Sequence, residues 1–385
     1  MPTHIAVIGA GAFGGWTALH LLRAGHRVTL IDAWGPGHSR SSSGDETRVV
    51  RCGYGPNTVY TQLTARAIKL WRENEQRWRL KLFHNNGVLW FSTVRNEAWD
   101  KAALEALREH QLPFESLRPE EAARRFPQIN WDGVLTAVLE QEAGFVLARR
   151  ACQAVFEGFL AENGTYRQAQ VEPGTITSGR MGPLRLNDGS TLAADQYVFA
   201  AGPWLPGLFP NVLGRALTPT RQDVFYFGTP AGDSRFNESN FPAWIDNSAT
   251  RYYGIPGNQW RGFKVADDTP GPAFDPSAGE RVASPDALAA ARAYLARRFP
   301  GLAQAPLSES RVCQYEMSAD GHLIAARHPE ASNAFVLGGG SGHGFKFSPA
   351  LGEQAARWVL GESAPPREFS LERYKNGPAG VGERK

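Results

Sequence analysis

Three glycines close to the N-terminus have a spacing that can hold a nucleotide. Gly9, Gly11 and Gly14 form the pattern G-x-G-x-x-G, and Asp32 follows at the end of the next apolar segment. The first glycine of such a pattern permits a tight turn, the second lets the backbone approach a pyrophosphate, and the third lets a helix pack closely on a strand. The acid is placed to accept hydrogen bonds from the adenosine ribose. We therefore expect a bound dinucleotide, and this pattern alone does not separate FAD from NAD.

The elements that must hold these residues follow from the periodicity of apolar side chains. Strands over 4–8 and 27–31 and a helix over 17–24 complete a βαβ unit around the glycines. Further helices are expected over 60–77, 99–110, 119–126, 147–161 and 285–299. Further strands are expected over 87–93, 197–201 and 334–337, with a hairpin over 184–193. Alternating aromatic segments between residues 217 and 264 predict an antiparallel sheet in a second domain.

Length and composition limit the class of protein. A chain of 385 residues exceeds the usual size of one hydrophobic core, so we expect two domains. With 41 basic and 38 acidic side chains and no basic cluster, neither nucleic acid nor a membrane surface is an expected partner. No apolar run is long enough for a membrane span or a signal peptide, and three scattered cysteines fit neither a disulfide framework nor a zinc site. We therefore expect a cytoplasmic protein without a metal.

Beyond the glycine unit, the sequence resembles the monomeric sarcosine oxidase and N-methyltryptophan oxidase family of D-amino-acid-oxidase-like flavoproteins. The likeness spans most of the chain and is carried by motifs at 47–51, 53–55, 221–222, 252–254, 312–315 and 342–348, of which the last two are the most specific. The resemblance implies an α/β plus α+β fold and a monomer. It implies a Rossmann-type FAD-binding domain from residues 1–80, 144–214 and 311–385. A substrate domain with an antiparallel sheet, from residues 81–143 and 215–310, would interrupt it.

The same resemblance implies FAD as the cofactor and assigns the residues that hold it. The family's matching cysteine carries the flavin through a thioether to its 8α methyl, so Cys313 is expected to do so here, although a buried lone cysteine can also be inert. The expected catalytic residues are Lys264, Arg48, Tyr253 and Tyr315. The expected cofactor-binding residues are Gly9, Gly11, Gly14, Asp32, Ser42, Thr47, Arg48, Cys313, Gly342, Gly344, Phe345 and Lys346.

Arg51 and Lys346 match the residues that grip the substrate carboxylate in the family, and an arginine fork suits a carboxylate. Arg48 matches a residue beneath the flavin ring, and Lys264 matches a lysine on the flavin face where oxygen arrives. Lys346 and the amides of residues 344–347 also place positive potential where the reduced flavin is negative. The alternatives are a solvated lysine at 346, an ordinary surface salt bridge for the arginines, and a strand lysine at 264 with its amine in water.

Several positions depart from the family pattern and put sarcosine itself in doubt. Ser43 and Gly44 replace two histidines, Trp244 replaces a methionine of the substrate pocket, and Asp268 replaces an active-site histidine. Trp244 and Asp268 are therefore expected substrate-binding residues. Asp268 would favour a substrate with a distal cation, although a turn residue within 267–270 is the simpler interpretation.

The expected activity is oxidation of a secondary, N-methyl or cyclic amino acid to an imine, with oxygen as acceptor and hydrogen peroxide as product. The alternatives are a flavin dehydrogenase that passes electrons to a quinone or carrier, and an oxidase of primary or larger amines. A non-catalytic flavoprotein and an NAD enzyme are further alternatives. The near-neutral charge disfavours an RNA-modifying enzyme.

Overall fold

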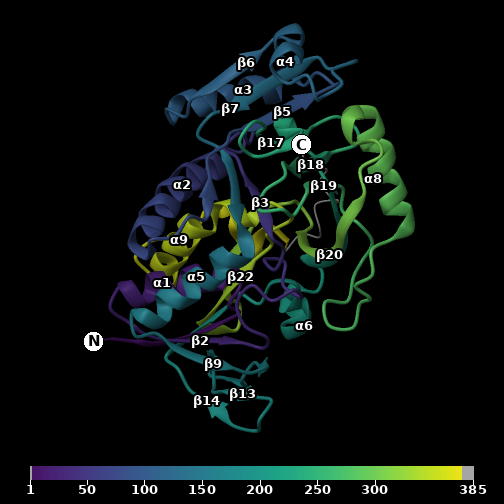
Figure 1. The fold of residues 1–385 in the computed structure, drawn as a ribbon. Helices are drawn as coiled ribbons and strands as arrows, with labels where there is room; N and C mark the ends of the chain where they lie inside the picture. Colours follow the sequence, from purple (N-terminus) through teal and green to yellow (C-terminus); the bar gives the residue numbers. More distant parts are fainter. Residues whose placement is uncertain (1, 375–385) are drawn as a thin grey trace.

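A six-stranded sheet organises the part of the chain that begins with the glycine motif (Figure 1). The computed structural model describes residues 2–374. The strand order is β21-β22-β15-β1-β2-β9, and all neighbours are parallel except β21 and β22. The strands are β1 His4–Ile8, β2 Arg27–Asp32, β9 Thr165–Gln168, β15 Gln196–Phe199, β21 Ile324–His328 and β22 Ala331–Gly338.

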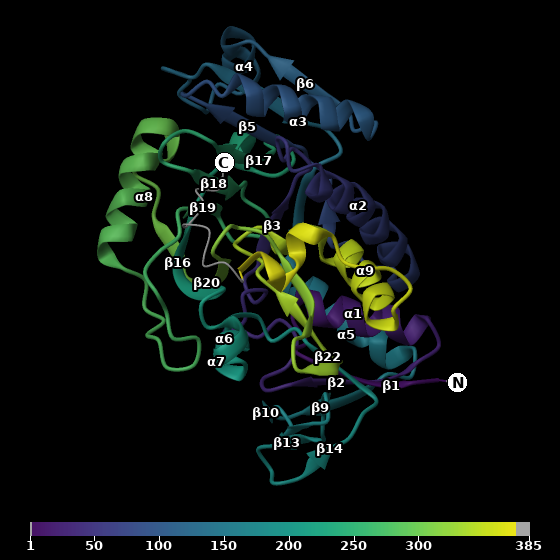
Figure 2. The same cartoon turned by 180° about the vertical axis from the view of Figure 1, so that it is seen from behind.

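Helices cover one face of this sheet. Alternate residues of β1 point to opposite sides of the sheet, so each face has its own core. Ile5 and Val7 pack in one core with helix residues such as Trp16 and Leu351, whereas Ala6 and Ile8 belong to the core on the other face. Figures 1 and 2 show these helices stacked together beside the sheet. They are α1 Ala12–Arg23, α2 Thr58–Trp78, α5 Ala148–Ala161 and α9 Ser348–Leu360.

An eight-stranded sheet forms the second large layer, with the order β20-β16-β19-β18-β17-β5-β7-β6. Its neighbours are antiparallel except β17 and β5. The strands are β5 Val88–Ser92, β6 Phe114–Leu117, β7 Thr136–Glu140, β16 Leu217–Phe227, β17 Ala243–Asp246, β18 Tyr252–Ile255, β19 Phe263–Asp267 and β20 Leu307–Ser318. The flanking helices are α3 Glu97–Glu109, α4 Pro119–Arg125 and α8 Pro285–Arg298.

Smaller elements complete the fold. One antiparallel sheet, β3-β8-β4, lies between the large layers, and another, β10-β13-β14, forms a lobe beyond β9. The two-stranded sheet β11-β12 contacts β22 instead. These strands are β3 Thr47–Val50, β4 Phe83–His84, β8 Gly144–Leu147, β10 Val171–Glu172, β11 Ile176–Thr177, β12 Arg180–Met181, β13 Leu184–Leu186 and β14 Thr191–Leu192. The short helices are α6 Leu205–Leu208, α7 Pro210–Leu213, η1 Gly202–Trp204, η2 Ser234–Phe236, η3 Pro300–Leu302, η4 Gly344–Phe347, η5 Arg367–Phe369 and η6 Leu371–Tyr374.

The mixed α/β fold class expected from the sequence is confirmed, and the expected elements are present with limits shifted by a few residues. The second sheet draws its strands from 88–140 and 217–267, as expected for a separate unit, but β20 crosses the expected boundary at residue 311. The domain limits themselves stay a prediction. Residues 375–385 of the last expected segment lie outside the described residues.

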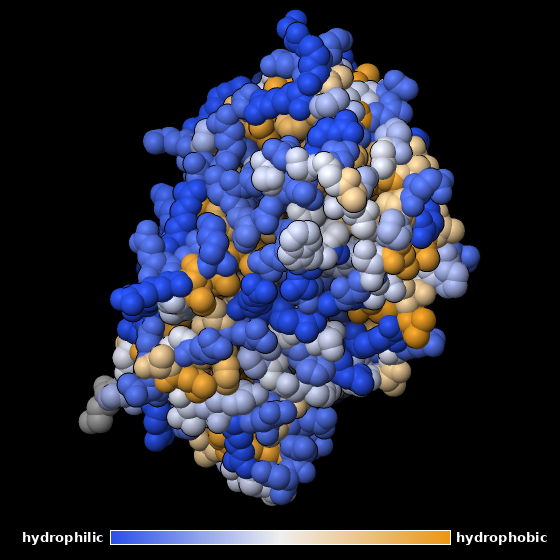
Figure 3. Space-filling model, viewed as in Figure 1, coloured by the Kyte–Doolittle hydropathy of each residue, from blue (hydrophilic) through white to orange (hydrophobic). Residues whose placement is uncertain are grey.

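Hydrophilic residues predominate on the face shown in Figure 3, and hydrophobic residues appear there as small separate groups. Between residues 2 and 374, no helix is both long enough and apolar enough to cross a membrane.

Candidate active site

A cavity of about 320 Å³ lies where β1 and β2 end and α1 begins. Gly9 turns the chain there with a φ of 107°, and a Cβ on this residue would lie 2.4 Å from the Ala200 carbonyl oxygen. A Cβ on Gly14 would lie 1.8 Å from the Gly9 carbonyl oxygen. Both positions therefore require glycine, which keeps the backbone of the turn close to the cavity and the N-terminus of α1 close to β1.

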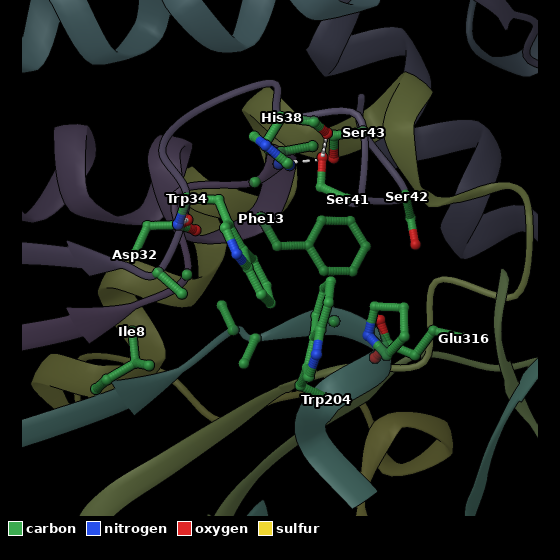
Figure 4. Close-up of a pocket in the computed structure, with 18 of the residues that line it drawn as sticks. Ile8, Phe13, Asp32, Trp34, His38, Ser41, Ser42, Ser43, Trp204 and Glu316 are labelled. Carbon is green, nitrogen blue, oxygen red and sulfur yellow. Dashed lines mark hydrogen bonds between the residues drawn. The ribbon is translucent and has the colours of Figure 1, made fainter. Parts of the chain in front are cut away.

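Asp32 is fixed at one end of the cavity by backbone amides. Its Oδ2 accepts a hydrogen bond from the Ala10 amide at 2.8 Å, and its Oδ1 accepts from the amides of Trp34 and Gly35, each at 2.8 Å. Figure 4 shows Asp32 and Ile8 at one end and Ser42 and Glu316 at the other. The cavity is therefore an elongated channel with an acid held at the end of β2.

The hydroxyl of Ser42, which lines the other end of the channel, is buried and makes no hydrogen bond within residues 2–374. The Thr47 hydroxyl, which does not line the channel, is also buried without such a bond. A buried polar atom without a partner is costly, and in a native structure it is a common sign of an absent ligand or water. The expected cofactor residues that line the cavity are Gly9, Gly11, Asp32, Ser42, Arg48, Gly342, Gly344 and Phe345. The glycine turn, the acid at the end of β2, the elongated channel and the buried hydroxyl of Ser42 together fit a flavin dinucleotide.

Lys264 lies on the face of the second sheet that points away from α8. Its neighbours on β19, Phe263 and Val265, belong to the core beneath α8, so alternation along the strand directs Lys264 to the opposite side. The side chain is fully buried. Its ammonium donates to Asp45 Oδ2 at 2.5 Å and to the Thr47 carbonyl at 2.8 Å. The alternative of a strand lysine with its amine in water is therefore wrong.

Asp45 joins Lys264 to Arg48 and Tyr226. Arg48 forms an ion pair with Asp45, and the Tyr226 hydroxyl donates to Asp45 Oδ1 at 2.8 Å. Burial opposes the negative charge of Asp45, but Lys264 and Arg48 outweigh it and hold the pKa of this carboxyl well below its usual range. Burial lowers the pKa of Lys264 to about 8, with Arg48 adding to the effect and Asp45 opposing it. The cluster thus holds a lysine whose charge is sensitive to pH near neutrality.

Cys313 lies beside this cluster on β20. Its Sγ is 3.1 Å from Arg48 Nη2, and it packs with Val224, Tyr226 and Ala266 on the same face of the sheet as Lys264. Arg48 Nη2 also donates to the Ser42 carbonyl at 2.8 Å. The arginine expected beneath the cofactor ring therefore contacts both the cysteine and the end of the channel, and it is not the exposed salt-bridge residue of the alternative interpretation.

A second cationic group forms around Tyr54. The Arg51 guanidinium carbon lies 4.7 Å from the centre of the Tyr54 ring, and the Lys346 ammonium lies 5.5 Å from it. Lys346 is 7% exposed, which excludes the solvated lysine of the alternative interpretation, and its ammonium donates to the His343 carbonyl at 2.8 Å. β3, which ends just before Arg51, packs against η4, which carries Lys346. The structure therefore brings together Arg51 and Lys346, the two residues expected to bind the substrate carboxylate.

Glu140 of β7 holds the backbone that carries Arg51. Its carboxylate accepts from the amides of Cys52 at 2.6 Å and Gly53 at 3.0 Å, and from the Trp90 indole at 3.1 Å. A Cβ on Gly53 would lie 2.9 Å from this carboxylate, so a glycine allows the close approach. No sequence signal had marked Glu140.

Asp268 and Tyr315 are brought together, although 47 residues separate them along the chain. The Tyr315 hydroxyl donates to Asp268 Oδ1 at 2.9 Å. In the adjoining turn, the Asp267 carboxylate accepts from the Thr269 amide at 2.8 Å. Burial raises the pKa of Tyr54 and of Tyr253, and the Asp268 charge contributes to both shifts. Asp268 therefore lies in the electrostatic surroundings of the expected site.

The expectation that Trp244 binds the substrate is wrong. It is fully buried and stacks between Phe263 and Tyr294, with ring centres 5.8 Å away on each side. These partners belong to the core beneath α8, on the face opposite Lys264. A side chain without accessible surface in that core cannot contact a substrate beside the channel, so Trp244 is a packing residue.

The chain is similar to a family of known proteins. The model of the family described as FAD dependent oxidoreductase matches residues 4–358. Monomeric sarcosine oxidase of Bacillus sp. (strain B-0618) is 31% identical over 368 residues, which cover 94% of this chain and 93% of that protein. N-methyl-L-tryptophan oxidase of Yersinia pestis (strain Pestoides F) is 28% identical over 97% of this chain and 100% of that protein.

Solved structures share the fold. The crystal structure of L-proline dehydrogenase from P. horikoshii matches with a TM-score of 0.85 and 19% identity, covering 97% of this chain and 98% of that one. NikD, an amino acid oxidase of nikkomycin biosynthesis, matches with a TM-score of 0.77 and 21% identity, covering 95% of this chain and 96% of that one. Given the family match along most of the sequence and the geometry of the channel, the chain belongs to the FAD-dependent oxidoreductases.

Proposed function

We propose that the protein is an FAD-dependent oxidase of a secondary, N-methyl or cyclic amino acid, with an imine and hydrogen peroxide as products. The observation that carries the proposal is the presence of two separate cation groups. Half-buried Arg51 and buried Lys346 both lie beside the Tyr54 ring, whereas buried Lys264 donates to Asp45 and to the Thr47 carbonyl. The first group suits a carboxylate, and the second suits an anion that forms from oxygen. Monomeric state and cytoplasmic location stay predictions.

Bound FAD would supply the hydride acceptor. Arg51 and Lys346 would bind the substrate carboxylate and so orient the carbon beside the amine nitrogen. That carbon loses a hydride and the nitrogen a proton, which leaves an imine. Lys346 would also stabilise the negative charge that the cofactor gains, and Arg48 would hold the channel end next to Cys313. The two electrons then pass with two protons to oxygen, where the Lys264 ammonium would stabilise the developing anion.

A substrate panel with two detection methods tests the proposal. Purified protein is mixed with N-methyl, cyclic and primary amino acids, and hydrogen peroxide is measured in air. We expect peroxide with secondary amino acids and little with their decarboxylated amines. Turnover that appears only with an added dye or quinone, and without peroxide, would instead favour the dehydrogenase alternative.

Covalent attachment through Cys313 is part of the proposal. Its support is the position of Cys313, whose Sγ lies 3.1 Å from Arg48 Nη2 and 3.8 Å from the carbonyl oxygen of Ser42, a residue that lines the channel. Acid precipitation of the wild-type protein should leave yellow flavin on the pellet. Cys313→Ser should release the flavin into the supernatant, whereas Cys152→Ser, a buried cysteine of α5, should not. A colourless wild-type pellet would contradict the thioether.

The reaction with oxygen should slow as the pH rises through about 8. The pKa of Lys264 is lowered to about 8, so its ammonium is charged below this pH and neutral above it. Only the charged form stabilises an anion, so the rate of reoxidation should fall on the alkaline side. Stopped-flow reoxidation between pH 6 and pH 10 measures this profile. A constant rate across this range would contradict a titration of Lys264 at the oxygen step.

A further inference from the structure

Glu316 is a buried acid at the channel end near Arg48 that the proposed reaction does not use. It follows Tyr315 on β20, lines the cavity and is 6% exposed. Figure 4 shows its side chain at the end of the cavity away from Asp32, close to Trp204. A carboxyl at such depth usually has a charged or hydrogen-bonded partner for each oxygen. The protein provides such a partner for one oxygen of Glu316.

One oxygen of Glu316 is satisfied by the protein. Oε1 accepts a hydrogen bond from the Gly339 amide at 2.5 Å, and a Cβ on Gly338 would lie 2.2 Å from the same oxygen. Oε2 lies on the side of Gly202, a residue that also lines the cavity, where a Cβ would be 3.5 Å away. Because Oε1 already accepts, a proton on the carboxyl belongs on Oε2, the oxygen on the cavity side.

Among the described residues, no charged side chain contributes to the pKa of Glu316, which burial and the Gly339 amide determine. Its neighbours are Pro219 of β16, Gly202 of η1 and the Gly338–Gly339 backbone, none of which titrates. The titratable and charged side chains of the same cavity are Asp32, His38, Arg48 and Tyr315. Burial raises the pKa of Glu316 to about 8, and the Gly339 amide opposes this only in part. At pH 7 the carboxyl is therefore mostly a neutral acid.

We propose that Glu316 donates a hydrogen bond from Oε2 to the bound cofactor as a neutral carboxylic acid, and that it takes up a proton when the cofactor is reduced at alkaline pH. This inference rests on the proposed occupancy of the channel by FAD. Reduction adds two electrons and one proton to the oxidised flavin and leaves one negative charge. A second negative charge on Glu316 in the same poorly solvated cavity is unfavourable, so an ionised Glu316 binds a proton as the flavin gains its charge. Two electrons then enter with two protons, one on the flavin and one on Glu316.

Potentiometric titration with dithionite tests the proposal and needs no amine substrate. Glu316→Gln keeps an acceptor and a donor but cannot ionise. Above pH 8 the wild-type midpoint potential should fall more steeply than that of Glu316→Gln, by about 30 mV per pH unit, which corresponds to one further proton per two electrons. Below pH 7 the two slopes should agree. The exposed Glu330→Gln should follow the wild type throughout.

A proton count on the wild-type protein provides an independent measurement. With a pH-indicator dye under anaerobic conditions, the number of protons taken up on reduction should rise between pH 7 and pH 9 in the wild type. Parallel slopes for wild type and Glu316→Gln, or an equal proton count at both pH values, would overturn the role of Glu316 and leave the oxidase proposal intact. A protein that binds no flavin would overturn the cofactor proposal together with this inference.

Discussion

Lys264→Met should slow the reaction of the reduced protein with oxygen by roughly a hundredfold or more, while reduction by the substrate changes much less. Methionine keeps most of the length of the lysine side chain and removes its charge. The first electron transferred to oxygen produces superoxide, and a fixed cation in a poorly solvated site stabilises that anion. Lys264 is fully buried and held by Asp45 and the Thr47 carbonyl, so its charge is fixed in place. Oxidation of the amine produces no anion at that position.

The contrast between the two half-reactions is the measurement. Stopped-flow absorbance of the flavin follows reduction by the substrate without oxygen and then reoxidation by dissolved oxygen. Lys69→Met, at an exposed position of α2, is the matched control and should change neither rate. If Lys264→Met is reoxidised as fast as the wild type, the strongest structural reason to prefer an oxidase over a dehydrogenase disappears.

Arg51→Ala and Lys346→Ala should each weaken kcat/KM for an amino acid by about 2 to 5 kcal/mol, the usual cost of removing one partner of a buried charge pair. This cost corresponds to a loss from about 30-fold to a few thousandfold. Arg51 should act mainly through KM because it contacts the carboxylate alone. Lys346→Ala should also lower the rate of flavin reduction, since Lys346 is proposed to stabilise the charge of the reduced cofactor.

Decarboxylated amines separate carboxylate recognition from general damage to the site. The wild type should lose most of its kcat/KM when the substrate carboxylate is absent, and the two variants should lose little more. Arg95→Ala, an exposed arginine, is the control for the loss of a positive charge. Equal activity of the wild type on an amino acid and its decarboxylated amine would contradict carboxylate recognition and leave the oxidase assignment standing.

Local chemistry made the cofactor end of the site predictable from sequence. Gly9 and Gly14 are needed because the backbone approaches within contact distance there, and Asp32 follows at the end of the next strand. The hairpin around Gly189 could also be predicted from the sequence, because the turn between β13 and β14 needs a residue with positive φ. Gly189 adopts a φ of 83° there. In each case the residue type follows from constraints within a short segment.

The oxygen end depends on contacts between distant segments, which no local pattern reveals. Asp45 lies 219 residues from Lys264 along the chain, and its carboxylate joins Lys264 to Arg48 and Tyr226 only after the second sheet packs on the first unit. Trp244 was expected in the substrate pocket because the resemblance to the family matches it with a methionine of that pocket. Its place in the strand instead directs the indole to the core beneath α8. The side of a sheet that faces a site is set by the packing of whole layers.

Anaerobic mixing of the purified protein with an N-methyl or cyclic amino acid tests the central claim most directly. We expect the yellow flavin absorbance to bleach on mixing, and to return on admission of oxygen with one hydrogen peroxide formed per amine oxidised. Bleaching that oxygen does not reverse would show a dehydrogenase. If no amino acid of these classes bleaches the flavin, the proposed function is contradicted.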